Sequence, residues 1–138
     1  MKDASGYTLS GCNAQALNHL EQALHEFRCF AGNPVATAEA ALAEAPGLVM
    51  AHVLRAWLYL LSAEADGVVP AREALDAARS LPCNEREAWH LGAIQQLCHG
   101  HWRAAAITLA SSSLNLLARP LTCRWSAPAS RHSCCQGA

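Results

Sequence analysis

Histidines and cysteines are the residues of this chain whose types and spacing could support chemistry. Residues 98–101 read Cys-His-Gly-His, and residues 132–135 read His-Ser-Cys-Cys, with Cys123 a few residues upstream. Structural zinc sites need four ligands, usually paired at defined spacings on two separate elements, and neither group has this pattern. A Cys/His metal-binding protein therefore stays a minor alternative, and we predict no metal site.

A nucleophilic mechanism would need a serine or cysteine beside a histidine, with a third group that orients the histidine. Cys29, His19 and His25 fall on or near one predicted helix. However, no nucleophile elbow or glycine-rich loop presents the thiol. We accordingly predict no catalytic residues and no cofactor.

Composition favours a single helical domain. The chain has 138 residues, of which 52% are hydrophobic and 15% charged, and alanine and leucine dominate. The net charge of −1 provides no concentrated basic surface for nucleic acid or anionic lipid. The longest apolar stretch, residues 47–61, is interrupted by His52 and Arg55 and is too short to cross a bilayer. Seven scattered cysteines and a polar start predict a reduced, cytoplasmic protein without membrane or nucleic-acid partners.

Hydrophobic periodicity and helix-end signals predict six helices after an irregular lead-in of residues 1–12. Asn33-Pro34 and the Asn84/Glu87 pair are typical helix starts, and Pro46-Gly47 is a helix stop. The third helix is apolar on nearly all sides, so Trp57, Leu58 and Leu61 are predicted to lie in the core. The predicted helices span about 13–31, 34–45, 48–63, 69–81, 84–99 and 101–109.

Consecutive helices are expected to pair into three hairpins. Pro46 and Pro82 each close a second helix and lie 36 residues apart, close to the period of about 34 residues in tetratricopeptide repeats. Leu91-Gly92, followed by Ala104, is similar to the repeat's pattern of large and small residues. We therefore predict an all-α fold, a right-handed α-solenoid of about three antiparallel hairpins over residues 13–109.

Three longer stretches carry a more specific resemblance. They are residues 42–62 (LAEAPGLVMAHVLRAWLYLLS), Asn84-Glu-Arg-Glu at a helix start, and Gly100-His-Trp-Arg-Ala-Ala105. Over about residues 3–109 the chain resembles the amino-terminal part of the tetratricopeptide repeat protein 38-like family, although alanine stands at 45 and 56 where an acid and a glycine are expected. The resemblance implies a helical-repeat fold, and it brings no catalytic residues.

From residue 110 the sequence changes character. Acids are absent after Glu87, while serine, arginine, proline and cysteine accumulate. We expect residues 110–138 to be a tail that is helical at its start and then disordered. Two origins stay open, an ordinary disordered terminus and a segment read out of frame.

The expected function is protein binding on a concave face formed by the first helix of each hairpin. The partner would be a protein or peptide, and the exposed C-terminal end of the repeat stack could also mediate self-association. An alternative is a truncated fragment of a longer repeat protein without autonomous function. The candidate contact residues on this face are Asn18, Gln22, His25, His52, Arg55, Tyr59, Arg86, Trp89 and Gln96.

Overall fold

The computed structural model describes residues 1–62 and 64–117, and for residues 113–117 only the backbone. The described chain is all-helical, as predicted, with 72% of its residues in helices and no strand. An isolated antiparallel bridge links Lys2 and Thr8 near the N-terminus. The elements are α1 (Ala14–Cys29), α2 (Pro34–Glu44), α3 (Val49–Leu61), the 3₁₀ turn η1 (Ala65–Gly67), α4 (Val68–Arg79), α5 (Glu85–Cys98) and α6 (Trp102–Leu117).

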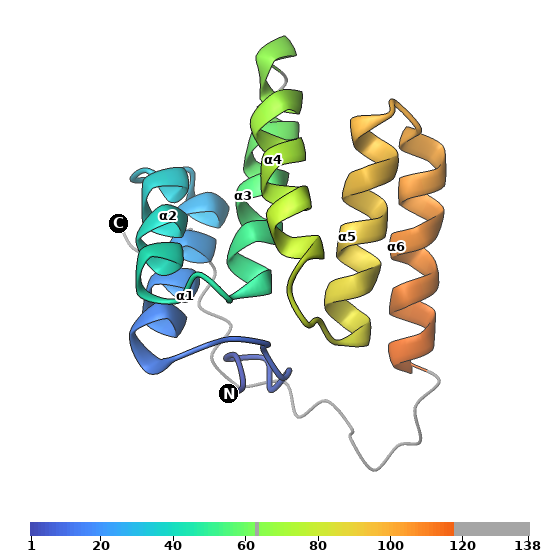
Figure 1. The fold of residues 1–138 in the computed structure, drawn as a ribbon. Coiled ribbons are helices and arrows are strands. Elements are labelled where there is room, and N and C mark those ends of the chain that lie inside the picture. Colours follow the sequence, from blue (N-terminus) through green and yellow to red (C-terminus); the bar gives the residue numbers. More distant parts are fainter. Residues whose placement is uncertain (63, 118–138) are drawn as a thin grey trace.

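The helices form three antiparallel pairs that lie side by side in chain order (Figure 1). The most extensive contacts are within the pairs, between α1 and α2, α3 and α4, and α5 and α6. Between the pairs, α3 packs on α2 and α5, and α4 also packs on α5. The second hairpin is therefore covered on both sides.

Local capping chemistry explains where the helices begin and end. The side-chain oxygens of Asn13 and Asn33 accept hydrogen bonds from backbone N–H groups in the first turns of α1 and α2. Asn84 and Glu87 form the predicted capping box of α5. Each of these caps satisfies amide groups that the helix itself leaves unpaired.

Two apolar clusters meet at α3. The first combines α1, α2 and one side of α3 and is rich in alanine, with Leu20, Leu48 and Leu54 as larger members. The second joins the other side of α3 to α4, α5 and α6, with Val53 and Ile94 among its members. The apolar circumference of α3 follows from this position between two clusters.

The structure corrects one predicted core residue and adjusts two boundaries. Leu58 is buried and Trp57 packs partly buried on the second cluster, but Leu61 is 51% exposed because it lies at the end of α3, beyond the cover of α5. Helix α4 begins at Val68, and α6 continues past Leu109 to Leu117. The prediction for the rest of the tail lies outside the described residues.

Residues 1–12, the N-terminal segment, are helix-free but tied to distant parts of the chain. Leu9 is 4% exposed and belongs to the first cluster. The Ser10 N–H donates to Oε1 of Glu87 over 3.0 Å, and the Asn84 side chain donates to the Thr8 carbonyl over 2.8 Å. The segment thus connects the first hairpin with the start of α5, as its path in Figure 1 also shows.

The backbone of the N-terminal segment comes close to the turn between α2 and α3 at Gly11. This glycine has a φ of +66°, and a Cβ atom there would lie 2.0 Å from the carbonyl oxygen of Gly47. Only glycine tolerates both conditions without moving the turn between α2 and α3. The contact places the N-terminal segment against the junction of the first two hairpins.

Candidate functional site

The candidate residues on α3 lie against α2. The imidazole Nε2 of His52 is 3.1 Å from the Pro46 carbonyl oxygen, in the turn that precedes α3. Arg55 is ion-paired with Glu39 of α2, with 3.6 Å between Nε and Oε1, and its guanidinium lies 5.8 Å from the ring centre of Tyr59. Arg55 therefore faces the neighbouring second helix, and His52 faces the turn between α2 and α3.

The candidate residues on α1 are solvent-exposed. Asn18, Gln22 and His25 all lie on the side of α1 that faces away from the core. The Gln22 amide donates to Glu26 over 2.9 Å, and the other oxygen of Glu26 accepts from the Thr37 hydroxyl over 2.7 Å. These bonds, that from Thr37 first, lower the pKa of Glu26 because they stabilise its charged form.

The candidate residues on α5 contact two further elements. Arg86 pairs with Asp3 of the N-terminal segment over 2.9 Å and lies over the ring of Tyr7, 4.3 Å from its centre. The Gln96 side chain accepts a hydrogen bond from Thr108 of α6 over 2.9 Å. Trp89 is half-buried.

These contacts place the nine candidates in different surroundings. On α3, Arg55 contacts α2, His52 contacts the turn between α2 and α3, and Tyr59 lies beside Arg55. On α5, Arg86 contacts the N-terminal segment and Gln96 contacts α6, whereas the candidates on α1 are exposed. The polar groups of Arg86 and Gln96 are already engaged within the chain. The structure does not bring the nine residues together in one shared groove.

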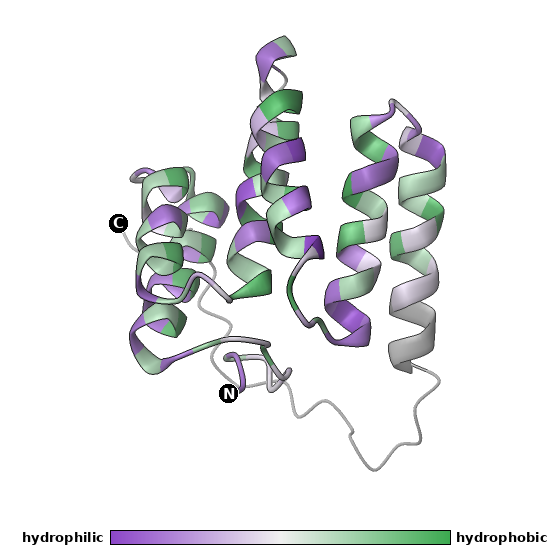
Figure 2. Ribbon diagram, in the orientation of Figure 1, coloured by the Kyte–Doolittle hydropathy of each residue, from purple (hydrophilic) through white to green (hydrophobic). Residues whose placement is uncertain are grey.

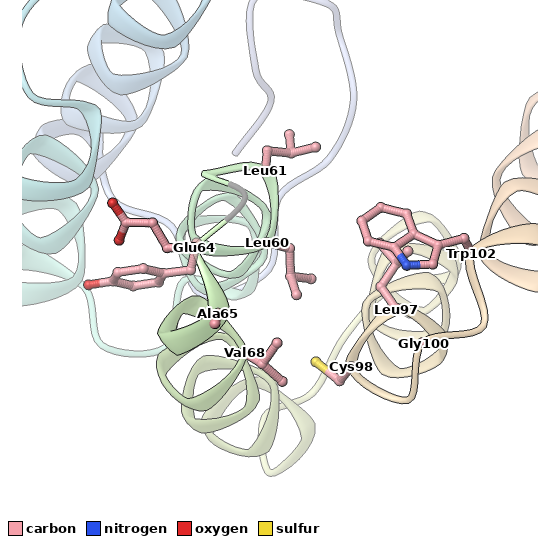
Figure 3. A pocket seen from close by; sticks show the side chains of 10 residues that line it. Leu60, Leu61, Glu64, Ala65, Val68, Leu97, Cys98, Gly100 and Trp102 are labelled. Carbon is pink, nitrogen blue, oxygen red and sulfur yellow. The ribbon is translucent and has the colours of Figure 1, made fainter.

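A pocket that the sequence did not indicate lies between the second and third hairpins. It has a volume of about 600 Å³ and opens where α3 ends, α4 begins and α5 turns into α6. Figure 3 shows Leu60 and Val68 on one side and Leu97, Cys98 and Trp102 on the other, whereas the carboxylate of Glu64 points away from Trp102. The full lining is Tyr59, Leu60, Leu61, Glu64, Ala65, Val68, Leu97, Cys98, Gly100 and Trp102.

The chemistry of this pocket is apolar. Trp102 is 60% exposed and, like Leu61 at the rim, presents a large hydrophobic surface to solvent. Burial raises the pKa of the Cys98 thiol, so the sulfur that lines the pocket stays protonated and acts as a small apolar group. The sequence signal for the pocket was weak, because Leu61 and Trp102 are apolar residues at helix ends that resemble core positions.

No group of three or more histidine, cysteine or acidic side chains in the described ranges, 1–62 and 64–117, is arranged to hold a metal ion. His99 and His101 flank the α5–α6 turn with ring centres 6.3 Å apart, and His99 hydrogen-bonds to the Gln95 carbonyl over 2.7 Å. The second cysteine and histidine group, at 123 and 132–135, lies outside the described residues. On α1, Nε2 of His25 lies 3.8 Å from Sγ of Cys29.

Fold and pocket define this chain as an all-helical protein of paired helices with an apolar pocket between two pairs. Among the described helices, none combines the length and the apolar character that crossing a membrane requires. Comparison with protein-family models, with curated proteins and with solved structures gives no match.

Proposed function

We propose that the chain is a non-catalytic protein-binding module, a tetratricopeptide-like α-solenoid that binds a peptide or a partner helix. The observation that carries this proposal is the apolar pocket between the second and third hairpins. The resemblance to the tetratricopeptide repeat protein 38-like family supports the same function, since repeat folds bind partners on the extended surfaces that their stacked units create.

The apolar lining of the pocket indicates what kind of side chain the partner would insert. Its facing walls are formed by aliphatic, thiol and indole side chains, so a bound group gains mainly by removing apolar surface from water. A leucine or phenylalanine on one face of an amphipathic helix fits this requirement. We therefore propose that the partner segment anchors one bulky apolar side chain between Leu60 and Trp102.

Selection of helical peptides from a display library against the purified full chain tests this proposal. Selected peptides are measured by calorimetry against the wild type, Leu61→Glu and the matched control Val69→Glu. Val69 is also a strongly exposed hydrophobic residue, on α4, but it does not line the pocket. We expect Leu61→Glu to weaken binding at least about tenfold, because a carboxylate at the rim must be desolvated, and Val69→Glu to leave it unchanged.

The double variant His52→Ala/Arg55→Ala separates the pocket from the face of α3 that contacts α2. Binding that is lost in this variant and kept in Leu61→Glu would move the site to that face. Failure of the wild type to bind any selected peptide would contradict the proposed function.

A further inference from the structure

The N-terminal segment begins with a small loop that satisfies part of its own backbone hydrogen bonding. The Leu9 N–H donates to the Met1 carbonyl over 2.8 Å and so closes the loop. Inside it, Oδ1 of Asp3 accepts hydrogen bonds from the N–H groups of Ser5 and Tyr7 over 3.0 and 2.8 Å, the local pattern by which an aspartate stabilises a turn. The loop is therefore a compact unit of its own, which rests on the helices.

Side chains on α1 and α5 hold the backbone of this segment. Glu21 of α1 accepts a hydrogen bond from the Ala4 N–H over 3.0 Å. On α5, Asn84 and Glu87 bind one backbone carbonyl and one backbone N–H of the segment. Figure 2 shows the beginning of α5 in the strongly hydrophilic colour. Contacts of this kind recognise the shape of a bound loop, because every residue except proline offers the same backbone groups.

Side chains of the segment supply the specific contacts. Oδ2 of Asp3 pairs with Arg86 over 2.9 Å, and the two side chains are only 15% and 25% exposed. The Arg86 guanidinium also lies 4.3 Å from the ring centre of Tyr7, since its planar group can bind a carboxylate and an aromatic face together. Leu9 is buried in the first cluster. The helix side chains that hold the segment, called here the loop-binding surface, are Glu21, Asn84, Arg86 and Glu87.

We propose that the loop-binding surface is a binding site for a turn-forming peptide of a partner protein, and that the N-terminal segment occupies this site when the partner is absent. The partner peptide carries the spacing of Asp3, Tyr7 and Leu9, namely an acid, an aromatic residue four positions later and a leucine two positions after that. The surface lies where α5 begins and the apolar pocket lies where α5 ends, so this inference does not depend on the proposed function.

The burial of the segment is consistent with its displacement. Among residues 1–10, Leu9 is the one buried side chain, and the remaining contacts are hydrogen bonds, an ion pair and a cation–π contact at the surface. A segment with so few buried apolar groups belongs to the part of a fold that opens most easily. The loop keeps its internal hydrogen bonds when it leaves, which lowers the cost of release.

Competition between the segment and the partner has a measurable consequence. A short covalent connection holds the segment near its site at an effective concentration on the order of millimolar. A partner peptide binds only the fraction of molecules in which the site is open. Weakening the segment should therefore tighten the binding of the peptide by the same factor. A purely structural contact predicts no such gain.

Fluorescence anisotropy of a labelled peptide of residues 1–10, with the full chain titrated to about 1 mM, tests this proposal. Asp3→Ala/Tyr7→Ala changes the segment and leaves the loop-binding surface intact. We expect this double variant to bind the peptide about tenfold more tightly than the wild type, because its own segment loses both contacts with Arg86. A peptide carrying the same two substitutions should bind the double variant about tenfold more weakly.

Variants of the surface locate the bound peptide. Adding Arg86→Ala to the double variant should weaken peptide binding about tenfold, whereas the matched control Arg103→Ala, at an exposed position of α6, should leave it unchanged. If the double variant does not fold, Asp3→Asn, which keeps the size of the side chain, should still tighten binding a few-fold. Equal affinity of the peptide for the wild type and the weakened variant, or no binding to that variant at about 1 mM, would overturn the proposal.

Discussion

The two ends of the row of hairpins are formed by helices of opposite surface character, α1 and α6. The exposed residues of α1 include Gln15, Asn18, Gln22, His25 and Arg28, whereas the exposed residues of α6 in its described part are mainly alanine, isoleucine and tryptophan. The described surface of α1 is thus polar, whereas the described surface of α6 is mainly apolar.

The N-terminal end of the row also differs from the C-terminal end in its long-range hydrogen bonds. Glu87 is 0% exposed, and its carboxylate accepts hydrogen bonds from the N–H groups of Ser10 and Asn84 over 3.0 and 2.9 Å. The first hairpin is therefore joined to the third through the N-terminal segment as well as through α3. The comparison shows that closure of one end depends on long-range polar contacts, while the other end is held by the packing of α6 on α5.

The same substitution on the inner and outer sides of the third hairpin should give the largest difference. Ile94→Ala removes a fully buried side chain of the second cluster and should lower the free energy of unfolding by about 4 kcal/mol. Ile107→Ala, on the exposed face of α6, should change it by less than about 0.5 kcal/mol in the monomer. Urea unfolding at a few micromolar measures both changes.

A comparable loss of stability for the two isoleucine variants at that concentration would contradict the assignment of an inner and an outer side. It would mean that residue 107 is covered within the monomer. The contrast between the two ends of the row of hairpins would then be lost.

Glu87→Ala tests the fastening of the N-terminal segment. It leaves the partly buried N–H groups of Ser10 and Asn84 without their acceptor, so we expect a loss of about 3 kcal/mol of unfolding free energy. Hydrogen exchange at Thr8 to Ser10 should accelerate more than exchange within α6. The control Glu73→Ala, on an exposed position of α4, should stay within about 0.5 kcal/mol of the wild type.

Equal acceleration of exchange throughout the chain in Glu87→Ala would contradict a local fastening. That result would show that Glu87 supports the whole fold through the capping box of α5 alone. The contacts of the N-terminal segment would then contribute nothing to the stability of the fold.

Helix boundaries were predictable from the sequence because the signals that set them are local. Asn33-Pro34 and the Asn84/Glu87 pair act within one helical turn, and the structure confirms both starts. The exposure of Leu61 was not predictable in this way. The exposure of Leu61 depends on how far α5 extends along α3. The local sequence does not indicate this distance, because Leu61 is one apolar residue among many in an apolar helix.

The candidate site was less predictable, since its contacts join residues that are far apart in the sequence. Arg86 meets Asp3 across 83 positions, and nothing in either local pattern indicates the pair. Arg55 faces α2 because α3 packs with one side on each apolar cluster, and the repeat spacing does not determine this rotation of α3 about its axis. The pocket was not predictable either, because it depends on how the second and third hairpins are placed relative to each other.

The smallest predicted effect concerns acid stability at the point where α5 meets the N-terminal segment. Burial, with a smaller contribution from the charge of Arg86, lowers the pKa of His90 below the usual value of about 6.5, and its Nδ1 is buried without a hydrogen-bond partner among the described residues. The unfolded chain therefore binds this proton more readily than the folded chain. The contribution of neutral His90 to the free energy of unfolding is fully present above about pH 6.5. It is lost as the pH falls below that value, by at most about 1.4 kcal/mol per pH unit.

The melting temperature of His90→Gln should accordingly fall less than that of the wild type between pH 7.5 and 5.5, while the melting temperature of the exposed control His101→Gln should fall as much as that of the wild type. Equal losses for wild type and His90→Gln would show that this imidazole does not couple the start of α5 to pH.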